Sequence, residues 1–564
     1  MPAAPVSTLA AAVARTLAQH VSDVVGVMGN GNAHLVDALV RETGVRYTPV
    51  RHEAGAVVAA DAYYRASGRL AAATATYGAG FTNTVTALAE AAQARTPLLL
   101  LAGEAPTSGQ RPWDVDQIAL ASAVGVRTYT VGRADAAGTV LLAVEHALAH
   151  RTPAVVALPY DVVTAPVSAA EAGAGAPSAL RLPSPHVPDG ERATAQLARF
   201  ARLLSRARRP LLLAGRGAWL AGAGPALREL ADLTGALTTT SVLGRGLFSP
   251  EADLGVAGGF GADGAMALAR GADVVLVVGA GLNPFTTRFG DLFGADATVL
   301  QVDLAETATH PFVDSYVRGD ARVVTEELVR LVRSERLERA ASASSGWRES
   351  VDVEAARARP QGDTLAPDGR LDPRSAAARL AELLPADRVV VSDGGHFIGW
   401  AAMYWPVAAP DRMVLVGTAF QSIGLGLPSV VGAALARPES TVVLTTGDGG
   451  GLMALADLES AVRVARGRGL AVVWNDAAYG AEVHVYGRQG LAPDPMLIPE
   501  VDFAAMAGAV GARGVVVRSL ADLDVLADWT ATPSAQREFL LLDLRVSPLV
   551  VAPYQEEILQ RAAR

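Results

Sequence analysis

Residues 441–480 read TVVLTTGDGGGLMALADLESAVRVARGRGLAVVWNDAAYG, and they decide the fold. The apolar, β-branched run 441–446 predicts a buried strand, which ends in a glycine-rich turn at Asp448. A segment with helical spacing follows, and 470–474 predicts a second strand that ends beside Asp476. Two buried strands joined by a helix are typical of a parallel sheet covered on both faces. The carboxyl ends of such strands meet at one edge, so we expect the two aspartates to converge there.

The same alternation of strand and helix patterns recurs along the chain. Alanine-rich segments with helical spacing, such as 54–66 and 192–205, lie between the strand signals. Short apolar runs that end in glycine or a small polar residue predict strands at 97–103, 153–158, 210–215, 273–279, 388–393, 441–447 and 538–543. The predicted fold class is therefore α/β, with three doubly wound parallel-sheet domains.

Two segments without an apolar period are predicted to be linkers. Residues 166–190 are rich in Ala, Gly, Pro and Ser, and residues 341–372 are polar and interrupted by Pro and Gly. They divide the chain into predicted domains at 1–165, 191–340 and 373–564, each long enough for its own sheet.

The composition excludes several classes of chemistry. The 564 residues include no cysteine and no lysine; all 48 basic residues are arginine. Disulfides, thiolate nucleophiles, Schiff bases on lysine and an ordinary P-loop are thereby excluded. A formal charge of −9 disfavours a nucleic-acid partner, and the chain lacks an apolar run long enough for a membrane span. No secretion signal is evident at the start, so a cytoplasmic location is expected.

The turn around Asp448 has the composition of a diphosphate–magnesium site. Gly447, Gly449 and Gly450 free the backbone for tight geometry, and the N–H groups at the start of the following helix suit an anion. Asp448 and Asp476 supply hard oxygen ligands, which Mg²⁺ prefers when it bridges protein carboxylates to a phosphate. An ordinary strand–helix turn is the alternative interpretation, because the triplet GDG also recurs by chance.

This segment resembles the diphosphate-binding motif of thiamine-diphosphate enzymes, in which GDG, a helix and a strand ending in NNxxYG follow one another. Aligned on Tyr479-Gly480, the resemblance implies metal ligands at Asp448, at Asp476 and at the backbone carbonyl of Ala478. The chain has NDxxYG rather than NNxxYG, so Asn475 is the alternative second ligand.

A second resemblance lies near the start of the chain. Residues 51–68, RHEAGAVVAADAYYRASG, resemble the RHE-x-GA…AA-x-x-YAR signature of the pyrimidine-binding domain in the same family. The resemblance implies that Glu53 contacts a ring nitrogen of the aminopyrimidine and shifts it to the imino tautomer, which removes the C2 proton of the thiazolium ring. Without the family context, Glu53 would be an acidic residue at the start of a helix, where its charge is favourable.

A third match connects the first domain to acetolactate synthases. Residues 74–104 are similar to a stretch of those enzymes, with Gly78, Gly80 and Asn83 at its glycine and asparagine positions. Ala79 replaces the usual proline. The resemblance implies that Gly78 and Asn83 contact the cofactor.

Two stretches of the last domain extend the match. The run DGGHFIGW resembles the segment that holds the diphosphate and places Gly395 and His396 on it. The run GTAFQSIGLGLP at 417–428 resembles the stretch that meets the pyrimidine, and it includes Gln421. Ile423 falls where the family has a bulky apolar wedge, which holds the cofactor bent so that its amino group reaches C2.

The resemblance implies a pyrimidine-binding domain at 1–165, a middle domain at 191–340 and a diphosphate/magnesium-binding domain at 373–564. In such enzymes the glutamate of one subunit acts on a cofactor held by another, which implies a homodimer or homotetramer. Thiamine diphosphate and Mg²⁺ are the implied cofactors. FAD is left open: glycines close two middle-domain strands, as in a nucleotide-binding remnant, but such glycines are generic in doubly wound sheets.

Within the family, the sequence favours carboligases and lyases of the acetolactate synthase and benzaldehyde lyase kind, which act on a 2-oxo acid, an aldehyde or an acyloin. The resemblance implies that Gln117 hydrogen-bonds the substrate carbonyl or the hydroxyl of an intermediate. It also implies that His484 and Tyr486 face the substrate. Ordinary loop packing is the alternative for these three residues.

The substrate-facing loop departs from the family pattern. Asn30 and Gly31 stand where benzaldehyde lyase has an alanine–histidine pair, and Thr76 stands where benzoylformate decarboxylase has a catalytic histidine. The loss of that proton carrier disfavours a simple 2-oxo acid decarboxylase. Such a decarboxylase and a non-catalytic cofactor-binding relative are the alternatives to a transferase or lyase.

Overall fold

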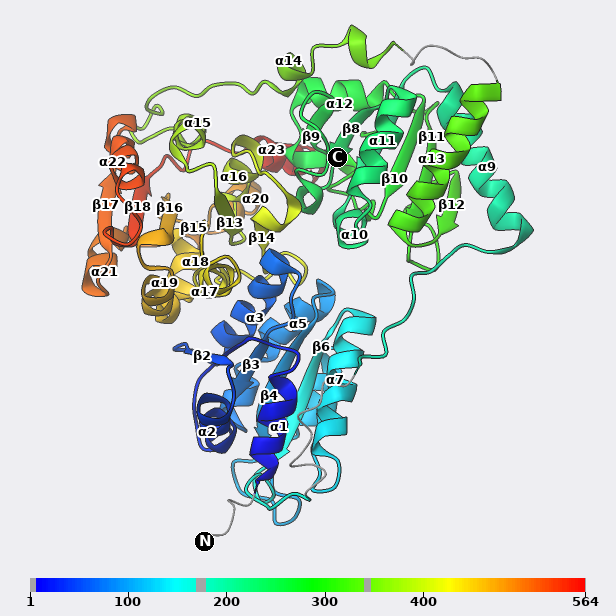
Figure 1. Ribbon diagram of the computed structural model, residues 1–564. Coiled ribbons are helices and arrows are strands. Elements are labelled where there is room, and N and C mark those ends of the chain that lie inside the picture. Colours follow the sequence, from blue (N-terminus) through cyan, green and yellow to red (C-terminus); the bar gives the residue numbers. More distant parts are fainter. Residues whose placement is uncertain (1–6, 169–178, 339–345, 563–564) are drawn as a thin grey trace.

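The computed structural model describes residues 7–168, 179–338 and 346–562. They form three six-stranded sheets in which every strand is parallel to its neighbours. Figure 1 shows the N-terminal sheet below (blue to cyan), with the middle sheet (green) and the C-terminal sheet (yellow to red) above it, all covered by helices. We call the parts around these sheets the N, middle and C domains. The predicted α/β class with three parallel sheets is confirmed.

The N and C domains share one strand order, and the middle domain has another. The N-domain sheet contains, in spatial order, β2 (Arg46–Pro49), β1 (Asp23–Gly26), β3 (Ala72–Ala75), β4 (Leu98–Glu104), β6 (Pro153–Pro159) and β5 (Arg127–Thr130). The C-domain sheet contains β14 (Met413–Leu415), β13 (Arg388–Ser392), β15 (Thr441–Gly447), β16 (Gly469–Asn475), β18 (Leu540–Arg545) and β17 (Arg513–Val517). The middle sheet contains β12 (Ser315–Arg318), β11 (Thr298–Asp303), β10 (Val274–Val278), β7 (Pro210–Ala214), β8 (Leu237–Thr240) and β9 (Asp253–Val256). This last order is that of dinucleotide-binding sheets.

The helices follow the same division. The N domain has α1 (Leu9–Leu17), α2 (Ala33–Glu42), α3 (Glu53–Ser67), α4 (Ala79–Thr82), α5 (Val85–Gln93), α6 (Gln117–Ala123) and α7 (Ala136–His150). The middle domain has α9 (Gly190–Arg206), α10 (Arg216–Leu220), α11 (Gly224–Thr234), α12 (Asp263–Arg270) and α13 (Ala321–Glu338). The C domain has α15 (Pro373–Leu383), α16 (Ile398–Tyr404), α17 (Gly426–Ala436), α18 (Asp448–Met453), α19 (Leu458–Ala465), α20 (Gly480–Val485), α21 (Phe503–Ala509), α22 (Val525–Ala531) and α23 (Pro553–Ala562). Across the described ranges, no helix has both the length and the apolar character needed to cross a membrane.

The two predicted linkers are only partly described. Residues 169–178 of the first and 341–345 of the second lie outside the described residues. The remainder of the second contains a 3₁₀ turn at Arg348–Ser350 and the short helix α14 (Val353–Arg357), which begins where the Asp352 side chain accepts a hydrogen bond from the Ala355 N–H. The domain boundaries stay predictions.

Helices α3 and α17 join the N and C domains within the chain. Both are buried on nearly every side, because alanine and valine surround each helix rather than occupying one face. A Cβ on Gly432 would collide with the carbonyl of Ala59, so the glycine permits the close crossing. Side chains of both helices belong to one hydrophobic core, and its burial favours a fixed arrangement of the two domains.

An aromatic cluster joins the middle and C domains. Phe260 and Phe285 pack edge-on against Tyr554 of α23, with ring centroids 5.2 and 5.9 Å away. The Tyr554 hydroxyl donates to the carbonyl of His396 at 2.9 Å. The C-terminal helix therefore holds the loop after β13 against the middle domain.

Candidate functional site

A cavity of about 70 Å³ lies at the carboxyl ends of β15 and β16, where the sequence predicts the diphosphate–magnesium site. Its wall comes from the loop after β13, the loop before α17 and the segments that follow β15 and β16. The predicted cofactor residues on this wall are Gly395, His396, Ile423, Gly447, Asp448, Gly449, Gly450, Asp476, Ala478, Tyr479 and Gly480. The fold thus brings together residues that lie far apart in the sequence.

Asp448 and Asp476 form an interacting pair in this cavity. Burial raises the pKa of Asp448 to about 6, and burial together with the charge of Asp448 raises the pKa of Asp476 to about 8. Asp448 Oδ1 accepts from the Gly449 N–H at 2.9 Å, whereas Oδ2 is buried with no hydrogen-bond partner among the described residues. Two desolvated carboxylates that repel each other suit a divalent cation, which would relieve both costs. With the Ala478 carbonyl, these residues fit Mg²⁺.

Asn475, the alternative ligand, is turned away from the cavity. Its Nδ2 donates to Asp543 Oδ1 at 2.9 Å and to the Val501 carbonyl at 3.0 Å. Asp476 is the next residue and lies on the cavity wall. Because successive side chains of a strand point to opposite sides, only one of the two can face the cavity. The geometry favours Asp476.

Two turns border the cavity with bare backbone. A Cβ on Gly449 would lie 2.6 Å from the Tyr479 ring, and a Cβ on Gly480 would lie 2.8 Å from Asp476 Oδ2. A side chain at either position would displace Tyr479 or Asp476, so glycine keeps these two groups in place on the cavity wall. Main-chain groups can then approach an anion such as a diphosphate directly.

His396 and His484 pack together beside the cavity, with ring centroids 4.7 Å apart. His396 Nε2 accepts from the Ala552 N–H at 2.9 Å, and burial lowers the pKa of His396 to about 3. Burial also lowers the pKa of His484, so both rings are neutral near pH 7. Tyr486 is 46% exposed, and Gln421 is exposed with its Nε2 donating to the Thr418 carbonyl. Contacts of His484 and Tyr486 with a substrate, and of Gln421 with the cofactor, stay predictions.

The sequence motifs do not single out Asp393, which the structure places at the centre of the loops around the cavity. Its fully buried carboxylate accepts from the N–H groups of Gly394 and Gly424 at 2.8 and 3.1 Å and from Thr446 Oγ1 at 3.1 Å. Burial raises the pKa of Asp393. The signal available in the sequence is an aspartate directly after a predicted strand, in the same position as Asp448 after β15.

Glu53 begins α3 in the N domain and is half-buried. Asn83 Nδ2 donates to Glu53 Oε2 at 2.9 Å, across a separation of 30 residues. A Cβ on Gly80 would lie 3.3 Å from Glu53 Oε1. The structure therefore brings Glu53 and Asn83 together, and the amide orients the carboxylate at a solvent-accessible position of the single chain.

The predicted substrate loop lies at the carboxyl ends of β1, β3 and β4. The Gly31 N–H donates to Thr76 Oγ1 at 2.9 Å, and Asn30 Nδ2 donates to the Tyr77 hydroxyl at 2.8 Å. A Cβ on Gly103 would lie 2.6 Å from Gly31 Cα. The structure thus gathers the three predicted residues, while their contact with a substrate stays a prediction.

Gln117 is buried at the start of α6, and its amide is engaged within the chain. Oε1 accepts from the Gly78 N–H at 2.7 Å, and Nε2 donates to the Gly103 carbonyl at 2.9 Å and to Glu104 Oε2 at 3.1 Å. Burial raises the pKa of Glu104, a second polar group that the sequence motifs do not single out. Gln117 therefore braces the turn at Gly78 against β4, and a bond to a substrate requires one of these bonds to break.

The predicted cofactor residues form two half-sites, one around Glu53 in the N domain and one around Asp448 and Asp476 in the C domain. These half-sites are separate within one chain. Among the described residues, the cavity that holds Asp448 and Asp476 is lined by C-domain positions only. Glu53 and Asn83 belong to the N domain and are not on its wall.

FAD binding stays an open prediction, and the cavity nearest the strand-closing glycines of the middle domain is small for an extended dinucleotide. The cavity beside the glycines that close β7 and β10 measures about 240 Å³, below the roughly 300–1,000 Å³ of typical ligand pockets. Phe260 and Phe285 line it. The Arg216 guanidinium at its edge donates to the Ala94 carbonyl of the N domain at 2.8 Å, and burial lowers the pKa of Arg216 to about 10.

A larger cavity, about 910 Å³, lies between the middle and C domains. Its charged lining includes Arg288 and Glu557, which pair at 3.0 Å. Its described lining contains none of the predicted site residues, so size does not mark the candidate site in this molecule.

Three family models match consecutive parts of the chain. Residues 7–122 match the thiamine pyrophosphate enzyme, N-terminal TPP binding domain, and residues 197–328 match the central domain of the same enzymes. Residues 393–543 match the C-terminal TPP binding domain. Glu53 lies in the first match, and Asp448 and Asp476 lie in the third.

Curated relatives match over almost the full length. The chain is 30% identical to a sulfoacetaldehyde acetyltransferase from Rhodobacter capsulatus, covering 98% of this chain and 96% of the relative. It is 30% identical to a probable 2-ketoarginine decarboxylase from Pseudomonas aeruginosa (97% and 95%) and 28% identical to the acetolactate synthase isozyme 3 large subunit of Escherichia coli (88% and 88%). A solved thiamine diphosphate-dependent 4-hydroxybenzoylformate decarboxylase from Rhodococcus jostii shares the fold, with a TM-score of 0.76, 20% identity and coverage of 96% and 99%.

Proposed function

This chain belongs to the thiamine pyrophosphate enzyme family, and on that premise we propose that it is a carboligase or lyase that acts on a 2-oxo acid or an acyloin, in the manner of acetolactate synthases. The observation that carries the proposal is the pair of half-sites. One holds Glu53 oriented by Asn83, and the other holds the interacting carboxylates Asp448 and Asp476.

Thiamine diphosphate, when bound, supplies a carbon nucleophile that adds to a substrate carbonyl and takes up the electron pair of the cleaved carbon–carbon bond. Asp448, Asp476 and the Ala478 carbonyl would hold Mg²⁺ and through it the diphosphate. Nε2 of neutral His396 already accepts a hydrogen bond, so its remaining N–H, at Nδ1, is the donor that it offers. Ile423 contributes an apolar side chain to the wall.

Glu53 would hold a proton at a ring nitrogen of the cofactor. Asn83 donates to Oε2 and leaves Oε1 for this task. A general acid or base must lie within hydrogen-bond reach of the atom it serves, so a second surface has to bring the cofactor to Glu53.

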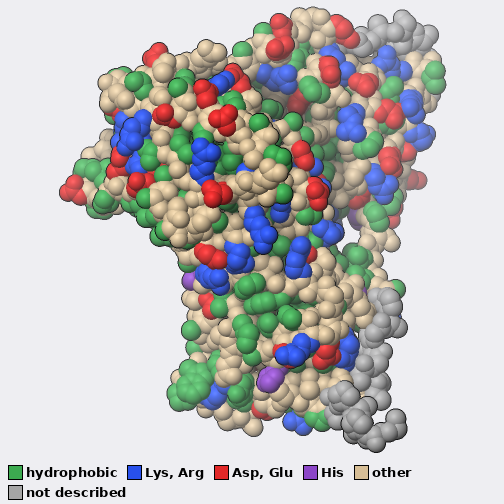
Figure 2. All heavy atoms as spheres, turned by 60° about the vertical axis from the view of Figure 1, so that its left-hand side comes forward, with side chains coloured by type: hydrophobic (Ala, Val, Ile, Leu, Met, Phe, Trp, Pro, Cys, Tyr) green, Lys and Arg blue, Asp and Glu red, His purple; other side chains and the backbone are tan. Residues whose placement is uncertain are grey.

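We infer that this second surface belongs to another copy of the chain. Glu53 is absent from the wall of the Asp448 cavity, and both half-sites carry exposed apolar side chains. Met28 and Trp113 in the N domain and Met453 and Leu497 in the C domain are each more than half exposed. Figure 2 shows hydrophobic side chains gathered on the lower part of the molecule, where the N domain lies. Such patches favour burial in an interface.

Complementation tests the shared site. Glu53→Gln and Asp448→Asn chains are each expected to be inactive alone. Mixed, unfolded and refolded together, they should regain about a quarter of the wild-type activity, because half of the dimers then contain one intact site of two. No recovery, with mixed dimers detected by mass spectrometry, contradicts a site built from two chains.

The reaction itself is tested with a substrate panel. The protein, thiamine diphosphate and Mg²⁺ are incubated with pyruvate, benzoylformate and benzoin, alone and with an aldehyde acceptor, and the products are identified by mass spectrometry. An acyloin, acetolactate or an aldehyde released from benzoin supports the proposal. Free aldehyde and CO₂ as the only products of the 2-oxo acids support a decarboxylase instead.

A non-oxidative 2-oxo acid decarboxylase is the second candidate. Its support is the 30% identity to the probable 2-ketoarginine decarboxylase over nearly the whole chain. Against it stands Thr76, whose hydroxyl is not an acid of suitable pKa and whose Oγ1 already accepts from Gly31.

A further inference from the structure

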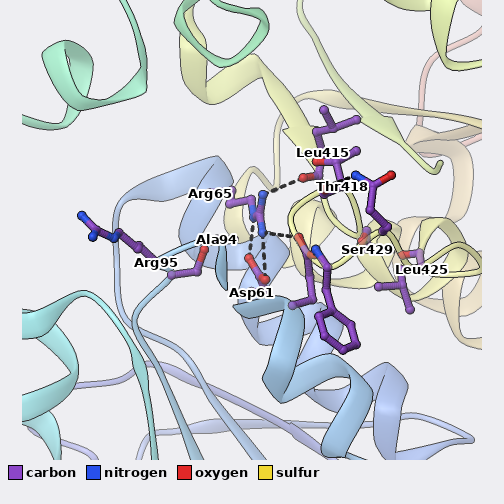
Figure 3. A network of polar contacts seen from close by, with 12 residues as sticks. Asp61, Arg65, Ala94, Arg95, Leu415, Thr418, Leu425 and Ser429 are labelled. Carbon is purple, nitrogen blue, oxygen red and sulfur yellow. Dashed lines mark hydrogen bonds and ion pairs between the residues drawn. The ribbon is translucent and has the colours of Figure 1, made fainter. Parts of the chain in front are cut away.

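A buried ion cluster lies between the N domain and the loop that carries Ile423. Asp61 and Arg65 are one turn apart on α3, Glu90 lies on α5, and each of the three is at most 7% exposed. Arg65 donates through Nε to Asp61 Oδ1 at 2.5 Å and through Nη2 to Asp61 Oδ2 at 3.0 Å and Glu90 Oε1 at 3.1 Å. Figure 3 shows the guanidinium lying between Asp61 and Leu415.

The remaining bonds of the ion cluster cross into the C domain. Arg65 Nη1 donates to the carbonyl of Leu415, the last residue of β14, at 2.5 Å. The N–H of Phe420 donates to Glu90 Oε2 at 2.7 Å. One buried cation and one buried anion therefore hold two main-chain groups at the start and in the middle of the segment 415–425.

This segment has a backbone that needs such support. Gly417, Gln421 and Gly424 all have positive φ, at 109°, 58° and 79°, and Gln421 is not a glycine. The Ser422 N–H donates to the Gly417 carbonyl at 2.8 Å and closes the bend. Asp393 then accepts from the Gly424 N–H at 3.1 Å. Glu90 thus holds the bend from within, at Phe420, and Asp393 holds the chain just after it, at Gly424.

Ile423 lies between these two anchors and on the wall of the cofactor cavity. Phe420, held by Glu90, precedes it by three residues, and Gly424, held by Asp393, follows it. A Cβ on Gly394 would lie 3.1 Å from Ile423 Cγ2, so the side chain also packs against the diphosphate loop. A shift of either anchor moves this side chain.

The middle domain contacts α5, the helix that carries Glu90. Arg216 Nη1 donates to the carbonyl of Ala94, the residue that ends α5, at 2.8 Å. All three domains therefore meet at the helix that carries Glu90.

The charges of Asp61, Arg65 and Glu90 allow the cluster to hold the main-chain groups of Leu415 and Phe420. Burial would lower the pKa of Arg65, but Asp61 and Glu90 outweigh it and the pKa lies above its ordinary value. Two carboxylates face one guanidinium, so Glu90 has acceptor capacity left for the Phe420 N–H. A neutral side chain in its place cannot accept from both donors.

We infer that Asp61, Arg65 and Glu90 are positioning residues, which fix the segment 415–425 and thereby the place of Ile423 on the cofactor cavity. The fixing of the segment stands on the geometry alone. Its consequence for the cofactor rests on the proposed function: a displaced wedge should slow removal of the C2 proton more than it weakens binding.

Amide hydrogen exchange of the cofactor-free protein tests the first part. Glu90→Gln keeps the shape of the side chain but replaces one carboxylate oxygen by an NH₂ group, which cannot accept from Arg65 or from the Phe420 N–H. The backbone amides of residues 416–425 should therefore exchange about tenfold faster. Arg65→Lys keeps the charge but loses the fork that reaches Leu415, and it should show the same increase. Unchanged protection of 416–425 in both variants overturns the inference.

Asp411→Asn is the matched control. Asp411 accepts from Arg437, whose Nε donates to the Ala66 carbonyl at 2.7 Å, so this carboxylate also supports an N–C domain contact. It lies before β14, at the opposite end from Leu415. Protection of 416–425 should match the wild type in this variant. An equal increase there shows general loosening and overturns the inference.

A double-mutant cycle tests the second part. At saturating thiamine diphosphate and Mg²⁺, Glu90→Gln and Ile423→Ala should each slow C2–H exchange of the bound cofactor about tenfold, and the double variant should be within about twofold of Ile423→Ala. If the two single-variant effects multiply in the double variant, Glu90 acts independently of Ile423, and the positioning role is overturned. A wild-type protein that takes up no cofactor refutes the proposed function, while amide exchange still decides the first part.

Discussion

The N and C domains have the same strand order, yet they present different chemistry at the carboxyl edges of their sheets. In the C domain, separate segments close around a cavity in which Asp448 and Asp476 raise each other's cost of ionisation. In the N domain, Glu53 stands at a helix start with one amide partner, Asn83. A shared topology sets where a site can form, and the side chains decide what it does.

The difference has a physical basis. Two buried carboxylates are unfavourable until a cation neutralises them, so the C-domain half has the chemistry that our proposal requires for a metal and an anion held by it. A single hydrogen-bonded carboxyl group needs no metal, but it acts on a proton only when a second surface excludes water. The two halves are complementary, so variants in one half should affect proton transfer and variants in the other should affect binding.

The largest effect is expected from the N-domain half. Glu53→Gln removes the acid, so C2–H exchange of bound thiamine diphosphate should slow by about 10²- to 10⁴-fold. Cofactor affinity, measured by calorimetry, should change little, because the proposal assigns the diphosphate to the C-domain half. Asn83→Ala, which only releases the carboxylate, should slow exchange by about tenfold. An unchanged rate in Glu53→Gln would show that another group activates the cofactor.

The C-domain half should respond in affinity instead. Asp476→Ala removes a ligand, so Mg²⁺-dependent binding of thiamine diphosphate should weaken by about 100-fold. Asn475→Ser should lower the free energy of unfolding by about 1–3 kcal/mol through its lost bond to Asp543, with affinity retained. The reverse outcome, lost affinity in Asn475→Ser alone, would make Asn475 the ligand.

The pair should also make metal binding depend on pH. Because the pKa values of Asp448 and Asp476 are raised to about 6 and about 8, Mg²⁺ must displace protons below pH 8, and its affinity should fall by up to about tenfold per pH unit between pH 8 and 6. In the metal-free protein, the folded state keeps protons that the unfolded chain has lost, so stability should fall as the pH rises from about 4 to about 8. Asp476→Asn should flatten both profiles, measured by calorimetry and urea unfolding. Flat profiles in the wild type would contradict the raised pKa values.

The smallest effect concerns Gln117. Because its amide holds Gly78, Gly103 and Glu104, Gln117→Ala should lower the free energy of unfolding by about 1–3 kcal/mol in urea titrations. If kcat/KM falls more than about tenfold while stability is unchanged, Gln117 contacts the substrate rather than bracing the loop.

Much of the fold could be predicted from the sequence, because strands of parallel sheets are buried on both faces and form nearly continuous apolar runs. The run 97–103 is β4 at Leu98–Glu104, and 441–447 is β15 at Thr441–Gly447. The short helix α14 lies inside a segment that is predicted to be a linker because it has no apolar period. Apolar periodicity therefore misses a helix that buries few apolar side chains. The cluster of Asp61, Arg65 and Glu90 carries no local signal of its role, since its partners lie up to 350 residues away.

The sequence by itself determined the available chemistry: oxygen ligands after two strands, a glutamate in a family motif, and no thiol or amine nucleophile. Such features depend on residue type and on neighbours along the chain. Only the tertiary structure decided that Asp476 rather than Asn475 faces Asp448, that the Gln117 amide is already engaged, and that Glu53 lies outside the cavity of its own chain. Burial and hydrogen-bond partners come from segments far apart in the sequence, so they exist only once those segments pack.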